Sequence, residues 1–349
     1  MTDSFEIRIA SSVDEIGEEA WDALSAGQPF QSAHWYRFGE RVMQDCRPTY
    51  IILSLQNRAI ARATFWLVRS EPLPVSPFIR SLLAPLLQRW PLLICRSPLS
   101  NTSGLILPED ASLREGALQA IAETVSVELR RLGGSFLLFD YLQANQTKWA
   151  GWPRHSRPVV VSGPGTRLAL GPGGFADYLR SNKKFRIHQH FRRSRQEAAD
   201  LGIQVSRHGS FDGSSRSLEL IHNVERRHES MPNPWAAGML EHMQMVESTW
   251  LTATIQDRLV GCMLLLMDNG GQIAALPGLT EEVPYAYFML LYEAIQDAFD
   301  RHVACLHWGS GAYETKRRLG FELEKNNYTV VLGSNPIFRG IANLMAGLV

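Results

Sequence analysis

The stretch that decides the fold is V-A-C-L-H-W-G-S-G-A-Y-E-T-K-R-R-L-G-F, residues Val303–Phe321. It begins with a short apolar run that contains Val, Cys, Leu and Trp, which predicts a buried strand. The next residues, Gly309-Ser310-Gly311, end this strand, and a segment of helical composition follows until Gly320 stops it. Tyr313 and Lys316 are therefore expected just beyond the carboxyl end of a strand, where open sheets present their ligands.

Length and composition place the chain among globular proteins of two domains. It has 349 residues, more than one ordinary core accommodates, and 45% of them are hydrophobic while 20% are charged. Lys plus Arg and Asp plus Glu both number 35, so the net charge is zero. Because no overall field attracts nucleic acid, any recognition of phosphate must be local.

The sequence contains no clear motif for a metal site or for a membrane-spanning segment. The four cysteines are far apart, which predicts buried free thiols and no metal site. The N-terminus has no basic start or apolar segment of a secretion signal, so we expect a cytoplasmic protein. The apolar stretch from Leu73 to Cys95 is interrupted by Arg80 and several prolines and is too broken to span a membrane. A loop that covers the core is favoured there, and a peripheral membrane contact is the alternative.

The first half of the chain is predicted to form a hairpin, a further strand, a helix and a strand. A strand at 5–9 and two short helices come first, and Ser32 is a plausible cap of the second helix. The later elements are expected at 50–55, 59–68, 105–107, 112–132 and 136–141. Periodicity is lost from 143 to 158, so we place the domain boundary there, giving domains 1–150 and 151–349.

The second half repeats this outline, which suggests an internal duplication. A strand at 166–170 precedes a long helix that ends near Leu201, and a hairpin, a strand and a helix that begins at Pro284 lead to the Val303 stretch. A strand at 328–332 is expected to close this second sheet, and an apolar helix ends the chain. Strands and helices in this order give an α/β (α+β) class.

One helix carries a row of basic side chains. Lys183, Arg186, His190 and Arg193 are three, four and three residues apart, which places them on one helical face. In an otherwise neutral protein such a row could bind the phosphates of coenzyme A, of a nucleotide-linked acceptor or of a tRNA end. A solvated basic face is about equally consistent with the pattern.

The run G-A-Y-E-T-K-R-R-L-G-F resembles the C-terminal signature of the Fem-type (FemAB-like) branch of the GNAT acyltransferases. The opening W-D-A-L followed by P-F-Q-S-x-x-W, and the strand T-R-L-A-L before the basic helix, resemble the same branch. The run R-L-V-G-C-M-L-L-L with the strand, turn and helix after it looks like the GNAT core. The resemblance covers nearly the whole chain and implies two tandem GNAT-like domains, each a mixed, mostly antiparallel twisted sheet flanked by helices.

The resemblance also implies roles for individual residues. Lys316 matches the Lys of the family's Y-x-x-K signature, and we expect it to stabilise an oxyanion or the leaving ester. Tyr313 is a candidate proton donor or pocket-shaping residue, and His307 is a candidate base, with a purely structural histidine as the alternative. Catalysis requires Tyr313 and Lys316 to face an open cleft, which we expect between the two halves.

The implied reaction is the formation of an amide from an activated acyl or aminoacyl donor and an amine on a small molecule or peptide. In the GNAT core the turn and helix start, here Pro284, Tyr285 and Ala286, bind the donor's pyrophosphate. Glu281 and Glu282 would repel that group. Acyl-CoA as co-substrate and the 3′ end of an aminoacyl-tRNA therefore both remain candidates, the latter with a Fem-type peptide ligase of cell-wall synthesis. A non-catalytic binding module of the same fold is the third interpretation.

Overall fold

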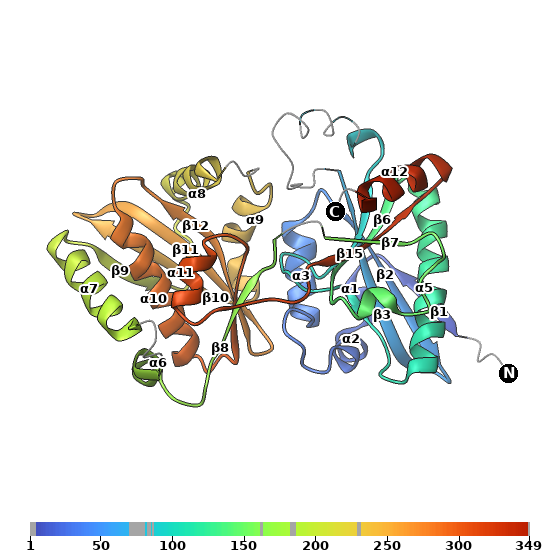
Figure 1. Ribbon diagram of the computed structural model, residues 1–349, viewed down its shortest axis with the longest axis horizontal. Helices are drawn as coiled ribbons and strands as arrows, with labels where there is room; N and C mark the ends of the chain where they lie inside the picture. The colour runs from blue at the N-terminus through green and yellow to red at the C-terminus, as the bar shows by residue number, and fades with distance from the viewer. Residues whose placement is uncertain are drawn as a thin grey trace. The chain divides into compact units, whose positions relative to one another are not determined.

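The computed structural model describes residues 5–69, 87–160, 163–181, 186–228 and 232–347, together with residues 81 and 85. The chain divides into two compact units, of which unit 1 comprises Met1–Gly163 with Lys325–Val349 and unit 2 comprises Pro164–Glu324. Each unit is built on one twisted, mixed sheet with helices packed against it (Figure 1). This confirms the predicted class.

The sheet of unit 1 has the strand order β1-β2-β3-β4-β6-β15-β7, and β5 pairs with β3. Its neighbours are antiparallel except β4 and β6, which are parallel. The hairpin between β2 and β3 turns at Gln56 and Asn57, whose φ angles of 52° and 62° match the turn that suits twisted strands. The strands are β1 Glu6–Ala10, β2 Arg47–Leu55, β3 Arg58–Val68, β4 Leu92–Cys95, β5 Leu105–Ile106, β6 Phe136–Leu142, β7 Arg157–Val160 and β15 Tyr328–Gly333.

Most helices of unit 1 begin at side chains that cap them, whereas the helix Glu18–Ser25 begins after Gly17 without such a cap. The hydroxyl of Ser32 accepts a hydrogen bond from the amide of Trp35 at 3.1 Å, as predicted, and Asp110 caps the long helix α5 in the same way. Helix α5 packs its buried face, which includes Ile121 and Val125, on the apolar centre of the sheet. The helices are α1 Val13–Ile16, α2 Glu18–Ser25, α3 Ala33–Val42, α5 Ala111–Arg131 and α12 Pro336–Gly347.

The C-terminal segment belongs to unit 1, which corrects two expectations. Strand β15 pairs with β6 and β7, so the prediction that residues 328–332 close the second sheet is wrong. The expected domain 151–349 accordingly loses its last 25 residues to unit 1, Lys325–Val349, and the division falls between Gly163 and Pro164. The apolar pattern of β15 specifies a buried strand but carries no information about which sheet supplies its partners. Most of the apolar stretch 73–95 lies outside the described residues.

Unit 2 has a second sheet of order β14-β8-β13-β12-β11-β10-β9. All its neighbours are antiparallel except β12 and β13, which are parallel. The parallel pair therefore recurs in both units, in agreement with the predicted duplication. The strands are β8 Thr166–Ala169, β9 Gln204–His208, β10 Glu247–Ile255, β11 Arg258–Asp268, β12 Gly271–Leu279, β13 Cys305–Trp308 and β14 Glu322–Leu323.

Helices cover both faces of this sheet. Leu290 and Ile295 of α10 pack with Met263 and Leu265 of β11, whereas Cys262, which points to the other face, contacts the carbonyl of Ser217 on α8. The expected long helix before Leu201 is two helices, α6 and α7. The helices of unit 2 are α6 Phe175–Ser181, α7 Ile187–Asp200, α8 Ser215–Arg227, α9 Ala236–Glu241, α10 Pro284–Asp300 and α11 Tyr313–Arg318.

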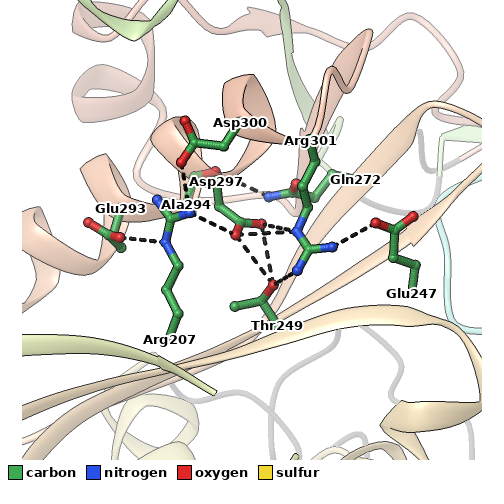
Figure 2. A network of polar contacts seen from close by, with 9 residues as sticks. All are labelled: Arg207, Glu247, Thr249, Gln272, Glu293, Ala294, Asp297, Asp300 and Arg301. Carbon is green, nitrogen blue, oxygen red and sulfur yellow. Dashed lines mark hydrogen bonds and ion pairs between the residues drawn. The ribbon is translucent and has the colours of Figure 1, made fainter. Parts of the chain in front are cut away.

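A polar network fastens the C-terminal end of α10 to the sheet (Figure 2). The carboxylate of Asp297 is 1% exposed and lies 3.3 Å from the guanidinium groups of Arg207 on β9 and Arg301. Thr249 on β10 accepts a hydrogen bond from Arg301 at 3.0 Å. This network fixes the position of α10 on the sheet. The N-terminal end of α10 follows β12 after a short loop, and the candidate site lies at that end.

Candidate active site

The second sheet opens at the carboxyl ends of its two parallel strands. The pairing of β12 with β13 runs from Gly271 with Cys305 to Ala274 with Trp308 and ends there. Strand β12 continues to Leu279 alongside β11, whereas the chain after Trp308 turns away through the glycines into α11. The backbone of Leu276 has a positive φ of 49°, which marks an irregularity where the two strands part.

A cavity of about 670 Å³ lies at this opening. Its walls come from α8 on one face of the sheet and from α10 on the other, with the end of β12 and the start of α11 between them. All the lining residues belong to unit 2, so the cavity does not depend on the cleft that was expected between the halves. The lining residues are Val224, Arg227, His228, Pro277, Leu279, Thr280, Glu281, Val283, Tyr287, Phe288, Trp308, Ser310, Gly311, Ala312, Thr315 and Lys316.

Lys316 is the buried cation of this cavity. The residue is 2% exposed, its Nζ donates a hydrogen bond to the carbonyl oxygen of Gly309 at 2.6 Å, and the ammonium lies 5.8 Å from the centre of the Trp308 ring. Burial lowers the pKa of Lys316 to about 8, against the opposing effect of the Glu324 carboxylate. The group is thus mainly charged at neutral pH and close to titrating.

The local sequence explains why this lysine points inward. Helix α11 has six residues and follows Gly311 and Ala312, which have φ angles of 87° and 46°. Lys316 and Leu319, three apart, lie on its buried face, while the side chains of the two arginines between them are exposed. The strand, turn and helix predicted from the Val303 stretch are therefore all present, with Lys316 just beyond the strand end.

Tyr313 and His307, the other two predicted catalytic residues, are not among the residues that line the cavity. Tyr313 is 36% exposed, and its hydroxyl donates a hydrogen bond to the carbonyl oxygen of Pro164 at 2.8 Å. His307 Nδ1 lies 2.6 Å from Glu324 Oε1. Burial opposes charge on His307, but the Cys305 and Glu324 side chains outweigh it and raise its pKa to about 9. An imidazolium cannot accept a proton, so a role as general base does not fit.

One side chain of the basic row on α7 packs against α10, and others are exposed to solvent. His190 Nδ1 lies 2.8 Å from the hydroxyl of Tyr292 on α10, where burial and nearby arginines lower the pKa of the imidazole. Arg193 is exposed, with Glu197 at 3.8 Å, and Arg186 is exposed at the start of the helix. Lys183 lies outside the described residues. The described members of the row do not line the cavity.

The start of α10 lies beside the cavity, although Tyr285 and Ala286, two of the three residues predicted there, are not among its lining residues. Pro284 begins the helix, Tyr285 is half-buried and Ala286 is fully buried. Their neighbours Thr280 and Tyr287 line the cavity instead. Tyr287 lies three residues after Pro284, so helical periodicity could have indicated it once the direction of the core was known.

Two polar features of the wall were not foreseen from the sequence. The hydroxyl of Thr280 is buried and has no hydrogen-bond partner among the described residues. A buried unpaired hydroxyl at a cavity is a group that a bound ligand can satisfy. Arg227, at the end of α8, lies 3.8 Å from Glu281 and thus offsets part of the negative charge before α10. Nothing in the local pattern of α8 indicated that its end meets the loop before α10.

The described residues contain neither a cluster suited to a metal ion nor a helix suited to span a membrane. Across the described ranges, no group of three or more His, Cys, Asp or Glu side chains is arranged to hold a metal ion. In the same part of the chain, none of the helices combines the length and the apolar character needed to cross a bilayer.

Comparison with known proteins gives a family for the part of the chain that contains the cavity. Residues 183–317 match the family model described as an acetyltransferase (GNAT) domain. No curated protein matches the chain. Similar solved structures include a tandem GNAT protein from the clavulanic acid biosynthesis pathway, solved without AcCoA. It shares 11% identity over 95% of this chain and 99% of that one, with a TM-score of 0.60.

Two further structures cover both units. FemX is 9% identical over 96% of this chain and 100% of its own, with a TM-score of 0.61. L-PGS from Bacillus licheniformis is 12% identical over 95% of this chain and 97% of its own, with a TM-score of 0.51. At these identities the likeness establishes the fold, and it extends across both units.

Proposed function

We propose that the chain is a tandem GNAT protein of the FemAB-like type and a GNAT-type acyltransferase, in which unit 2 forms an amide by moving an acyl or aminoacyl group from an activated donor to an amine. One observation carries the proposal. The ammonium of Lys316 is buried in the wall of a cavity at the opening between β12 and β13.

The chemistry needs little from the protein beyond charge and position. The neutral acceptor nitrogen attacks the carbonyl carbon, the C–N bond forms, and the carbonyl oxygen becomes an oxyanion. Lys316 donates a hydrogen bond to that oxyanion, and the burial of its side chain makes a preorganised donor effective. The oxyanion then collapses, the bond to the leaving sulfur or oxygen breaks, and the proton lost by the nitrogen passes to the leaving group or to solvent. No covalent enzyme intermediate is required.

The residues that line the cavity are suited to binding an acyl donor. Val283, Tyr287 and Trp308 give it apolar sides, while Thr280 and Lys316 supply the few polar groups that orient a ligand. Acyl-CoA is therefore the first candidate donor. Its phosphates would contact Arg227 more favourably than Glu281 at the start of α10.

A second donor candidate follows from the same charges. Glu281 and Glu282 are both exposed just before α10, where they oppose a pyrophosphate. An aminoacyl-tRNA presents its ester without a pyrophosphate at this position, as in a Fem-type peptide ligase. Both donors are made in the cytoplasm, which is where the proposal places the reaction.

A donor screen tests the proposal. We expect an acyl-CoA to raise the melting temperature and, with a panel of amines and amino-terminal peptides, to release free thiol. If charged tRNA is the donor, we expect label to pass from tRNA to the acceptor, with binding weakened as salt rises. Lys316→Met should remove transfer in either assay, whereas Arg317→Met, an exposed neighbour, should retain it. Binding of a partner without transfer from any donor would favour the non-catalytic module.

A further inference from the structure

An apolar patch lies on unit 1, whereas the candidate active site lies in unit 2. Ile337 and Ile341 of α12 are 74% and 41% exposed, and Trp90, just before β4, is 39% exposed. The Trp90 ring meets Phe338 edge-on at 5.8 Å. We define the α12 patch as these four residues, Trp90, Ile337, Phe338 and Ile341.

The packing of α12 on the sheet leaves Ile337 and Ile341 of this patch uncovered. The helix lies against β15 and β7 (Figure 1), where Ala342 is buried with Val159 and Val331. Phe338 also packs against Phe136 at 5.1 Å. Ile337 and Ile341 are one turn apart, so they form a stripe beside the packed face and not within it. The helix is therefore anchored by one side and presents aliphatic side chains on another.

Three arginines lie near residues of the patch. The guanidinium of Arg89 lies 6.0 Å from the centre of the Trp90 ring, and Arg69 donates a hydrogen bond to the carbonyl of Gln88 at 2.6 Å. Arg339 is exposed on α12 itself. All three arginines are exposed. An apolar centre with an aromatic residue and a basic rim is the composition of surfaces that settle into the headgroup region of a bilayer.

We propose that the α12 patch docks unit 1 on the surface of an anionic lipid bilayer. Ile337 and Ile341 would enter the boundary between headgroups and acyl chains, and Trp90 would lie at headgroup level. The arginines would contact lipid phosphates, and their charges would add electrostatic attraction to the anionic surface. Charge favours this occupant over a second copy of the chain, because two copies joined through this patch would bring their basic rims together.

Vesicle sedimentation with the full chain tests this docking. We expect the protein to sediment with vesicles of equal parts phosphatidylglycerol and phosphatidylcholine, roughly tenfold more than with phosphatidylcholine alone, and to dissociate at about 0.5 M salt. The double variant Ile337→Glu with Ile341→Glu should fall to the level of the neutral vesicles. Val127→Glu is the matched control, because Val127 is a 56% exposed apolar residue on α5 of the same unit. It should sediment as the wild type does.

A second pair of substitutions separates charge from apolar contact. Arg89→Gln with Arg339→Gln should weaken sedimentation with anionic vesicles and leave the weak binding to neutral vesicles unchanged. Melting temperatures close to the wild type will show that each variant is folded. The proposal is overturned if the wild type stays in the supernatant, or if the double glutamate variant sediments as well as the wild type. A dimer that this variant abolishes, without vesicle binding, would instead assign the patch to a second copy.

Discussion

The ε-amino nitrogen of Lys316 lies 2.6 Å from the carbonyl oxygen of Gly309, the first residue after β13. This contact holds a buried cation at the point where β12 and β13 part. The ammonium has three N–H donors, so it can keep this contact while it donates a hydrogen bond to a substrate carbonyl in the cavity. The lysine is thus positioned before the donor arrives, as preorganised stabilisation of an oxyanion requires.

The pH profile should report the ionisation of Lys316. Its pKa is lowered to about 8, so the proposed hydrogen-bond donor loses its charge as the pH rises through that value. With hydroxylamine as acceptor, which is already neutral at pH 7, kcat should fall about tenfold per pH unit above about 8. A rate that stays level to pH 10 would show that the charged lysine is not needed.

Replacing Lys316 by Met should stabilise the protein at neutral pH. The folded-state pKa of about 8 lies below the usual value of 10.5, so burial of the charge destabilises the fold below pH 8. Between pH 8 and pH 10.5, Lys316 is protonated in the unfolded chain and largely deprotonated in the folded chain. The stability of the wild type therefore rises with pH in this range, by up to ~1.4 kcal/mol per pH unit. In urea titrations the advantage of Lys316→Met, about 1–3 kcal/mol at pH 7, should shrink towards pH 10.

The ion pair of His307 with Glu324 should stabilise the fold on the acidic side. The folded-state pKa of His307 is raised from 6.5 to about 9, so its contribution is full below 6.5 and is lost as the pH rises through 9. Glu324→Gln should lower the imidazole pKa, measured by NMR, from the wild-type value of about 9. Glu322→Gln, an exposed acid on β14, is the control and should leave it unchanged. An unchanged titration in Glu324→Gln would contradict the pairing.

Asp297 should be the most sensitive position of the network shown in Figure 2. Its carboxylate is 1% exposed between Arg207 and Arg301, so Asp297→Ala leaves two guanidinium groups without their shared partner. A loss of about 1–3 kcal/mol of stability is expected in urea unfolding, because both arginines keep other carboxylate partners. Glu247 pairs with Arg301 at the surface, and Glu247→Gln should cost less than about 1 kcal/mol. Equal losses in the two variants would contradict this ranking.

Local patterns predicted the elements well and their partners less well. The Ser32 cap, both hairpins and the strand, turn and helix around Gly309 are formed by neighbouring residues, and the sequence indicated each of them. Strand β15 has the same kind of apolar pattern but pairs in unit 1 with β6 and β7. Pairing between distant strands depends on the whole sheet, which a short pattern does not encode.

The same limit applies to the site. Lys316 was indicated because its position depends on the short α11 and the strand directly before it. The packing partners of His307 and Tyr313 are Glu324 and Pro164, which come from other segments and could not be inferred from spacing. Arg227 and Tyr287 reach the cavity because α8 and α10 cover opposite faces of one sheet, and this requires the assembled fold.

The most direct test of the account is a single-turnover measurement of amide formation with the donor that the screen identifies. Lys316→Met should lower the rate of transfer by about 10²–10³-fold, the usual effect of removing one donor to an oxyanion. Arg317→Met, at the exposed neighbouring position, should stay within a factor of about two of the wild type. If Lys316→Met is folded and transfers the acyl group at the wild-type rate, the buried ammonium is not the catalytic group and the proposed mechanism is wrong.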